Sequence, residues 1–231
     1  MNQTAIVIGA TGLVGRALTE RLAAAGHVER IVTLTRRPAP HGDAKVLNQV
    51  VDFDRLEGYA EAFRGDIFFS CLGTTRKKAG SRHAQRVVDL AYQYRAARLA
   101  ADQGVRHYLL VSSSGADSRS RNAYLRMKGE LEQKVLALPF ERISIFQPSL
   151  LIGQREQVRW AEKLGGWLLP VFCAIPGLRR YRPIAGWQVA AKMVQVSRSR
   201  APGVAWYRLD EIFDADNVRD DAAMNEPDGF T

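Results

Sequence analysis

The sequence predicts an α/β protein with a doubly wound parallel sheet and a small C-terminal substrate-side segment. Three observations support this fold class: short apolar runs alternate with helical patterns, the runs are apolar throughout, and a glycine-rich turn joins the first run to the first helix. Continuously apolar strands separated by helices are typical of a parallel sheet covered on both faces. Right-handed crossovers then give a Rossmann-like arrangement.

Six strands and five helices carry this prediction. The runs of β-branched and aromatic residues predict strands at Ala5–Ile8, Arg30–Leu34, Val46–Val51, Ile67–Ser70, Tyr108–Ser112 and Ser144–Gln147. Apolar residues at three- and four-residue steps predict helices at Leu13–Ala25, Asp54–Phe63, Ser81–Gln103, Asn122–Ala137 and Trp187–Ser197.

We expect one domain over residues 1–213, in which residues 151–213, rich in Trp, Pro and Gly, form a lid on the substrate side. Residues 214–231 are acidic and lack apolar periodicity, so they are predicted to be a disordered tail. The apolar region Trp160–Leu178 has three possible roles: covering the active site, pairing with a second subunit as a homodimer, or touching a membrane surface. The longest nearly apolar stretch, Trp167–Leu178, is too short to span a bilayer.

The composition limits the classes of partner. The 231 residues carry a formal net charge of +9, which suits nucleic acid, anionic lipid or a phosphate-rich cofactor equally well. No nucleic-acid motif or stacking platform accompanies the charge, so specific nucleic-acid binding is not expected. The four histidines show no ligand spacing, and no metal is assigned. Two cysteines and the absence of a recognised leader predict a cytoplasmic protein.

The turn after the first strand has the chemistry of a diphosphate site. Its glycines, Gly9, Gly12 and Gly15, follow a G-x-x-G-x-x-G pattern and open the first helix. Glycine lets the backbone approach a pyrophosphate, and the free amides of a helix start attract anions. We therefore expect cofactor contacts from Gly9, Thr11, Gly12, Leu13, Val14 and Gly15.

The next two strand ends predict which dinucleotide binds. Arg36 and Arg37 follow the second strand, where an acidic residue would bind a ribose hydroxyl and arginine accommodates a 2′-phosphate. Two guanidinium groups at this point favour NADPH over NADH. After the third strand, Asp52 and Phe53 stand where they would contact the adenine, although a helix cap explains Asp52 nearly as well.

A tyrosine and a lysine supply candidate acid-base chemistry. Tyr124 and Lys128 lie four residues apart in a predicted helix and so share a face. An ammonium group near a phenol stabilises the phenolate, which suits Tyr124 as the proton donor to a carbonyl oxygen. Ser112, Ser113 and Ser114 follow the fifth strand, where one hydroxyl would polarise that oxygen.

Longer segments resemble the short-chain dehydrogenase/reductase family, in its atypical branch, over roughly residues 4–155. They are Val51–Phe53, Cys71–Gly80, Ser112–Asp117, Tyr124–Glu130 and Gln147–Leu150. The resemblance implies that Tyr124 is the general acid and that Lys128 orients the cofactor ribose. It also implies that Leu72, Gly73 and Thr74 line the cofactor, and that Pro148, Ser149 and Leu150 lie near the nicotinamide amide.

The usual serine-to-tyrosine separation in this family favours Ser112 as the catalytic serine, followed by Ser113. The sequence departs from the family at Asp89, where the proton relay commonly has asparagine. We expect an NADPH-dependent oxidoreductase that transfers hydride to a small carbonyl or enone substrate. The alternative is an NADPH-binding regulatory protein that acts through a protein partner without turnover.

Overall fold

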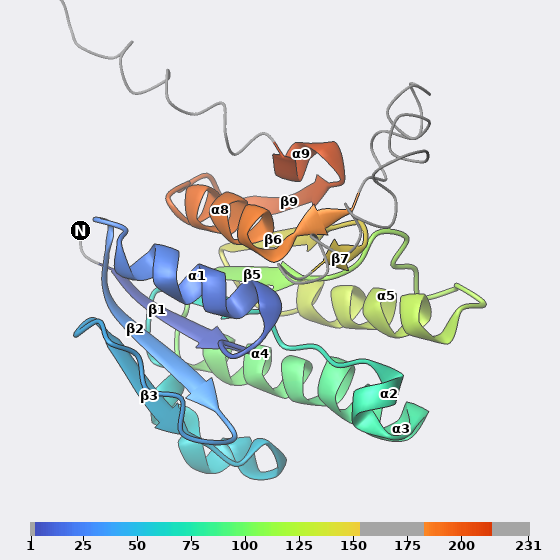
Figure 1. Ribbon diagram of the computed structural model, residues 1–231, viewed down its shortest axis with the longest axis horizontal. Helices are drawn as coiled ribbons and strands as arrows, with labels where there is room; N and C mark the ends of the chain where they lie inside the picture. Colours follow the sequence, from blue (N-terminus) through green and yellow to red (C-terminus); the bar gives the residue numbers. More distant parts are fainter. Residues whose placement is uncertain (1–2, 153–182, 214–231) are drawn as a thin grey trace, which may run out of the picture.

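The protein is described from a computed structural model, in which residues 3–152 and 183–213 form the described structure (Figure 1). Its centre is a seven-stranded sheet with the order β3-β2-β1-β4-β5-β6-β9, and every neighbouring pair is parallel. The strands are β1 (Gln3–Ile8), β2 (Val28–Thr35), β3 (Val46–Val50), β4 (Ile67–Ser70), β5 (His107–Val111), β6 (Arg142–Gln147) and β9 (Gly203–Arg208). The predicted doubly wound class is confirmed, and all six predicted strands form.

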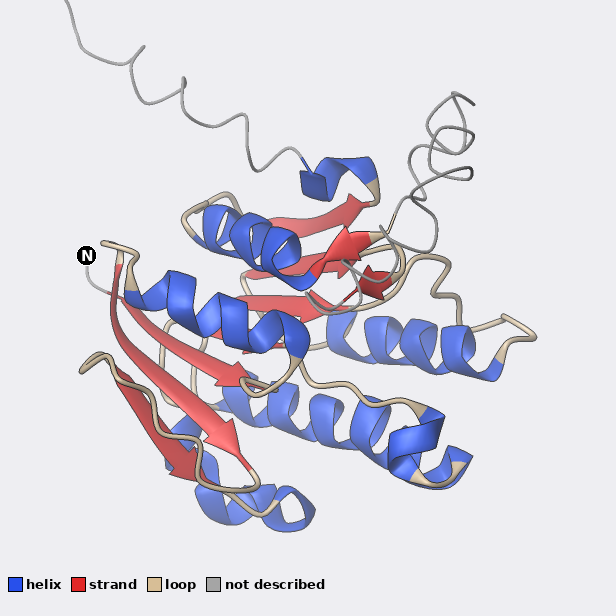
Figure 2. Cartoon of the chain, in the orientation of Figure 1, coloured by secondary structure: helices blue, strands red, loops and turns tan. Residues whose placement is uncertain are grey.

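Helices cover both faces of the sheet (Figure 2). They are α1 (Leu13–Ala23), the 3-10 segment η1 (Phe53–Phe63), α2 (Arg76–Ala79), α3 (Arg82–Arg86), the π-helical turn η2 (Val87–Tyr92), α4 (Gln93–Asp102), α5 (Ala123–Leu136), α8 (Gly186–Ser197) and α9 (Asp210–Phe213). A separate pair of short parallel strands, β7 (Leu151–Ile152) and β8 (Ile184–Ala185), lies beside the main sheet. None of the described helices has the length and apolar character needed to cross a membrane.

The strands are apolar throughout because alternate residues enter two different cores. In β1, Ala5 and Val7 pack in the core that includes residues of α1 and α8, whereas Ile6 and Ile8 pack in the core that includes residues of α4 and α5. Successive side chains of a strand point to opposite faces, so a strand with helices on both sides needs apolar residues at every position. This packing explains why a continuous apolar run, and not an alternating one, predicted the strands.

Two of the predicted helices are less regular than the sequence pattern suggests. The expected helix Ser81–Gln103 is divided into α3, η2 and α4, and η1 is a 3-10 segment with non-helical backbone angles at Arg55 and Tyr59. Inserted π turns of this kind keep a helix in place while adding a residue, and they are frequent at functional sites. The π turn here contains Asp89, which is buried.

Strand β9 is an addition that the sequence pattern did not predict. It pairs with β6 at the edge of the sheet, and Val204 and Trp206 are exposed. An edge strand hydrogen-bonds on one side only, so tertiary pairing decides whether it forms. Residues 183–213, which were expected within the lid, therefore contribute α8 and β9 to the body of the fold, and α8 packs against α1. The remaining lid residues, the apolar region Trp160–Leu178 and the acidic tail lie outside the described residues.

Gly129 allows a close approach between α5 and the loop after β5. A Cβ atom at this position would lie 2.2 Å from the Ser118 amide nitrogen and 2.3 Å from the Asp117 carbonyl carbon. Those contacts are with backbone, which cannot turn away as a flexible side chain can. Gly129 thus holds the loop that starts at Ser112 against the helix that carries Tyr124.

Replacing Gly129 by alanine should destabilise the fold by about 1–3 kcal/mol, the usual cost of overpacking. The free energy of unfolding in urea measures this loss. Gly58→Ala is the matched control, because a Cβ atom at Gly58 meets nothing within 4 Å. Equal unfolding free energies for the two variants would show that the loop moves freely away from α5.

Candidate functional site

The glycine turn between β1 and α1 lies at the carboxyl edge of the sheet, where the strand order reverses. Gly9 has a positive φ of 78°, and a Cβ atom there would lie 2.4 Å from the backbone of Cys71. The Gly12 amide donates to the Gly9 carbonyl at 2.9 Å, which closes the turn. Crevices at such reversal points are where α/β sheets bind ligands.

The start of α1 is chemically suited to an anion. Gly12 is the N-cap, no side chain caps the helix, and its first turn contains no acidic residue. Thr11, Gly12 and Leu13 are exposed, whereas Val14 and Gly15 are buried beneath the turn. The free amides and the positive end of the helix dipole therefore face solvent, as a pyrophosphate site requires.

A cavity of about 510 Å³ continues from this turn towards the end of β2. It is lined by Gly9, Thr11, Leu34, Arg36, Arg37, Phe53 and Leu72, among others. Arg36 and Arg37 are exposed and have no ion-pair partner among residues 3–152 and 183–213. The cavity thus combines apolar walls with two free guanidinium groups, which fits an adenosine that carries a phosphate.

The turn that presents the two arginines is fixed by polar side chains of β2 and β3. The Thr35 hydroxyl donates to the Arg37 carbonyl at 2.7 Å, and the Asn48 amide donates to the Thr35 hydroxyl at 2.9 Å. Asp52 is not among the lining residues: its carboxylate accepts from the Asp54 amide at 2.9 Å and caps η1. In the structure Asp52 thus acts as a helix cap, one of the two roles considered for it, whereas Phe53 lines the cavity.

Tyr124 and Lys128 differ sharply in their surroundings. Tyr124 is 37% exposed, and its hydroxyl forms no hydrogen bond with the residues that the structure describes. Lys128 is buried, its Nζ lies 3.7 Å from Asp89 Oδ1, and it donates to the Val111 carbonyl at 3.3 Å. A free phenol thus stands one helical turn before an ammonium group that is held in place.

Asp89 links this pair to the loop after β4. Its second carboxylate oxygen accepts from the Thr74 amide at 3.0 Å, and its side chain is 1% exposed. Burial raises the pKa of Asp89 above its ordinary value, and the Lys128 ammonium and the Thr74 amide act in the opposite direction. The loop after β4 is therefore held beside Lys128 through the bond between the Thr74 amide and Asp89.

The candidate serines have different roles in the structure. Ser112 is buried, and its hydroxyl donates to Oε1 of Glu132 on α5. Glu132 also accepts from the Gln147 amide at 3.0 and 3.1 Å, and Gln147 in turn accepts from Arg208 at 3.1 Å. Ser113 is half-buried, and among the residues that the structure describes its hydroxyl makes one long contact, donating to the Ser114 carbonyl at 3.4 Å.

Two members of this network, Glu132 and Gln147, were not predicted from the sequence as site residues. Glu132 follows Lys128 by four residues, so Tyr124, Lys128 and Glu132 form one stripe along α5, and this spacing is the signal that was available. Burial raises the pKa of Glu132, while hydrogen bonds from Gln147 and Ser112 act against the rise.

Pro148 is buried, and its carbonyl accepts from the Ser114 amide at 2.9 Å; Leu150 is exposed.

The sequence matches a known family over this whole region. A family profile described as NAD(P)H-binding matches residues 9–138, from the glycine turn to just beyond α5. The chain belongs to this NAD(P)H-binding family. The glycine turn, the arginine-lined cavity and the Tyr124 region thus lie in a protein of the NAD(P)H-binding class.

Related proteins narrow the group further. The chain is 39% identical to Protein HTATIP2 of Rattus norvegicus over 167 residues, which cover 71% of this chain and 69% of the relative. It is 42% identical to Protein fmp52, mitochondrial, of Emericella nidulans over 163 residues, which cover 68% and 70% of the two chains. The resemblance predicted from the sequence is confirmed at the level of this NAD(P)H-binding family and of the relative named HTATIP2.

Solved structures of the NAD(P)H-binding type share the fold. The structure of MoeE5 in complex with UDP-glucuronic acid and NAD superposes with a TM-score of 0.67, covering 89% of this chain and 76% of that chain at 16% identity. A short-chain dehydrogenase/reductase superfamily protein from Agrobacterium tumefaciens with bound NAD gives a TM-score of 0.64, covering 87% and 76% of the chains at 14% identity. At these identities the likeness concerns the fold alone.

The cytoplasmic location expected from the sequence is wrong according to these relatives. The proteins from Emericella nidulans, Eremothecium gossypii and Coccidioides immitis are all named as mitochondrial. A low cysteine content reports on the redox environment of a protein and does not distinguish one reducing compartment from another. The cysteine content therefore could not identify the cytoplasm as the compartment of this protein.

The buried pair gives a stability prediction. Lys128→Met leaves the Asp89 carboxylate buried without its cation, which should lower the free energy of unfolding by roughly 3–5 kcal/mol. The double variant Lys128→Met/Asp89→Asn should recover part of this loss, because it removes the uncompensated charge. Urea unfolding at neutral pH measures both effects.

The exposed pair of Arg64 and Glu61, 2.8 Å apart, provides the control. Arg64→Met should cost no more than about 1 kcal/mol, as surface ion pairs usually do. A Lys128→Met protein as stable as Arg64→Met, or a double variant less stable than Lys128→Met alone, would contradict the buried-pair interpretation.

Proposed function

We propose that the protein is an NADPH-dependent oxidoreductase that reduces a small carbonyl or enone compound, with Tyr124 as the proton donor. The observation that carries this proposal is the exposed Tyr124 hydroxyl, which has no hydrogen-bond partner among the described residues and lies one turn before the buried Lys128. A phenol kept free beside a fixed ammonium group is suited to general acid catalysis.

The cofactor would be held by the residues that the geometry brings to the sheet edge. The glycine turn would bind the diphosphate, and Arg36 and Arg37 would bind the 2′-phosphate. Leu72, Gly73 and Thr74 would line the side of the cofactor that faces Lys128. Pro148 and Leu150 follow β6 and would lie towards the nicotinamide. When bound, the reduced cofactor supplies the hydride for the substrate carbon.

The chain's own residues supply the rest of the chemistry. Tyr124 would donate its phenolic proton to the substrate oxygen, and the nearby ammonium charge of Lys128 would favour the phenolate that remains. Asp89 and the Val111 carbonyl hold Lys128 in position for this role. The half-buried Ser113 would contact the substrate oxygen, because the Ser112 hydroxyl already donates to Glu132.

A second candidate is an NADPH-binding regulatory protein that acts through a protein partner without turnover. The engagement of Ser112 with Glu132 favours it, since this serine is then unavailable to a substrate. A regulatory protein of this kind would bind the cofactor normally and would oxidise no NADPH with any compound tested. The free phenol of Tyr124 makes the enzyme our preferred proposal.

The role of Tyr124 is tested by Tyr124→Phe. A screen of carbonyl and enone compounds that follows NADPH absorbance first identifies a substrate. The variant should then lose at least about 100-fold in kcat, the usual contribution of a general acid, while its Kd for NADPH stays unchanged. Tyr94→Phe is the matched control, because Tyr94 lies on α4 beneath Lys134, away from the proposed site. Full activity in Tyr124→Phe would exclude the assigned role.

The preference for NADPH depends on Arg36 and Arg37. Each arginine replaced by alanine should weaken NADPH binding by about tenfold or more, because hydrogen bonds to charged groups contribute about 1.5–3 kcal/mol. NADH binding should change little, since NADH has no 2′-phosphate. Calorimetric Kd values for both nucleotides check this, with Arg30→Ala, an exposed residue near the start of β2, as the control. An unchanged ratio of the two Kd values in the double variant would remove the claim.

A further inference from the structure

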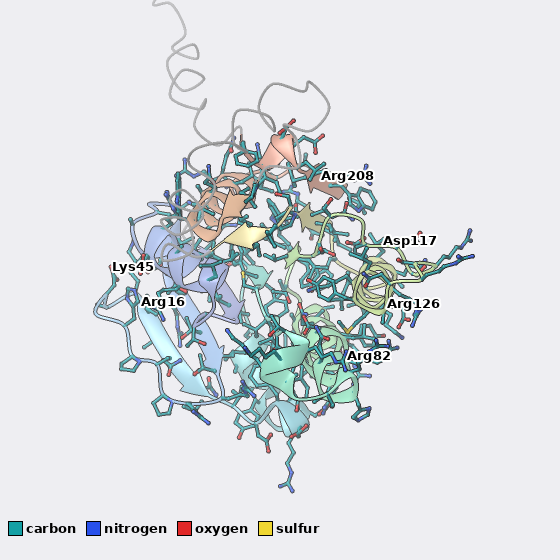
Figure 3. The ribbon with its side chains drawn as sticks, turned by 45° about the vertical axis from the view of Figure 1, so that its right-hand side comes forward. Arg16, Lys45, Arg82, Asp117, Arg126 and Arg208 are labelled. Carbon is teal, nitrogen blue, oxygen red and sulfur yellow. The ribbon has the colours of Figure 1, made fainter. Side chains whose placement is uncertain are left out.

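The entrance to the Tyr124 region is a strongly basic groove. It has a volume of about 700 Å³ and lies between α2 and α3 on one side and the start of α5 on the other. Its lining includes Tyr124 and the arginines Arg76, Arg82, Arg86, Arg121 and Arg126. Figure 3 shows Arg82 and Arg126, from α3 and α5, on the same side of the molecule. We call this feature the arginine groove.

The positive charge of the arginine groove is only partly compensated. Glu130 lies 2.5 Å from Arg86 and 4.0 Å from Arg126. In the described part of the chain, Arg76, Arg82 and Arg121 have no carboxylate within 4.0 Å and no side-chain hydrogen bond. Like charges that face one another across a concave surface repel, and the field they produce is concentrated inside it.

The contacts of these arginines indicate that they are not needed for folding. Arg95, by contrast, binds the Glu57 carboxylate and two backbone carbonyls of η1, which is a structural role. Arg82 and Arg121 are exposed and form no ion pair or side-chain hydrogen bond with residues 3–152 and 183–213. Both lie within the same cavity as the free phenol of Tyr124. Exposed basic residues on a convex surface are simply solvated, but here they surround one cavity of ligand size.

We propose that the arginine groove binds the phosphate group of the substrate, so that the compound reduced at Tyr124 is a phosphorylated carbonyl compound. Guanidinium groups bind phosphate through paired, charge-assisted hydrogen bonds. Arg76, Arg82 and Arg121 have no partner among the described residues. They offer more donors than one carboxylate would accept, whereas a phosphate has three free oxygens for them. The proposal rests on the proposed function for the reacting carbonyl, but the phosphate site itself can be tested without turnover.

The test uses inorganic pyrophosphate as the probe and protein saturated with NADPH, so that the glycine turn and Arg36 and Arg37 are already occupied. Calorimetry should detect binding to the wild type, and Arg82→Gln/Arg121→Gln should weaken it at least tenfold. Amide NMR shifts on adding pyrophosphate should concentrate in α3 and the first turn of α5. The double variant should keep its NADPH affinity and unfolding midpoint, since the two arginines make no described side-chain contacts.

A charge-matched control separates a defined site from general attraction. Arg30→Gln/Arg98→Gln removes two exposed positive charges elsewhere and should leave pyrophosphate binding within about twofold of wild type. An equal loss in both double variants, or unchanged binding in Arg82→Gln/Arg121→Gln, would overturn the proposed site. If turnover depends on Tyr124 but pyrophosphate does not bind, the proposed phosphate site is overturned and the proposed oxidoreductase is not. Pyrophosphate binding at the groove without any turnover would support the phosphate site and count against the oxidoreductase.

Discussion

The direct contact between the backbone at Gly9 and the backbone at Cys71 sets the geometry of the site. Because there is no room for a Cβ atom at Gly9, the first turn is held against the end of β4. From there a continuous set of contacts runs through the loop after β4: the Thr74 amide binds Asp89, and Asp89 pairs with Lys128. The glycine turn and the helix that carries Tyr124 are thus connected through one buried carboxylate.

The same edge of the sheet is tied to the last strands by a second polar network. Ser112 at the end of β5, Glu132 on α5 and Gln147 at the end of β6 share hydrogen bonds, and Arg208 of β9 joins them through Gln147. Buried polar groups are costly unless every member is satisfied, so such networks fix the relative positions of the elements that contribute to them. The two networks contain the buried charged residues Asp89, Lys128 and Glu132, and neither includes the Tyr124 hydroxyl.

This arrangement separates the residues that build the site from those that are available for chemistry. Asp89, Lys128, Ser112 and Glu132 are occupied by one another or by backbone groups. Tyr124, Arg36, Arg37 and the unpaired members of the arginine groove face cavities instead. The cavity beside the glycine turn and the two arginines after β2 is the one that we propose for the cofactor of this NAD(P)H-binding protein. The second cavity is lined by the candidate acid Tyr124 itself, and its positive charge is the basis of the phosphate that we propose for the substrate.

The sequence by itself determined the fold class, because the alternation of apolar runs with helical patterns and the glycine turn are local features that follow directly from backbone geometry. It also located Tyr124, Lys128 and the arginines after β2, since these depend on spacing along one element or on the end of a strand. Tertiary structure alone decided that β9 completes the sheet, because an edge strand forms only when its partner is in place. It also decided that Ser112 is engaged by Glu132 and that Asp89 holds Lys128, because burial and pairing of polar groups depend on residues brought together from distant parts of the chain.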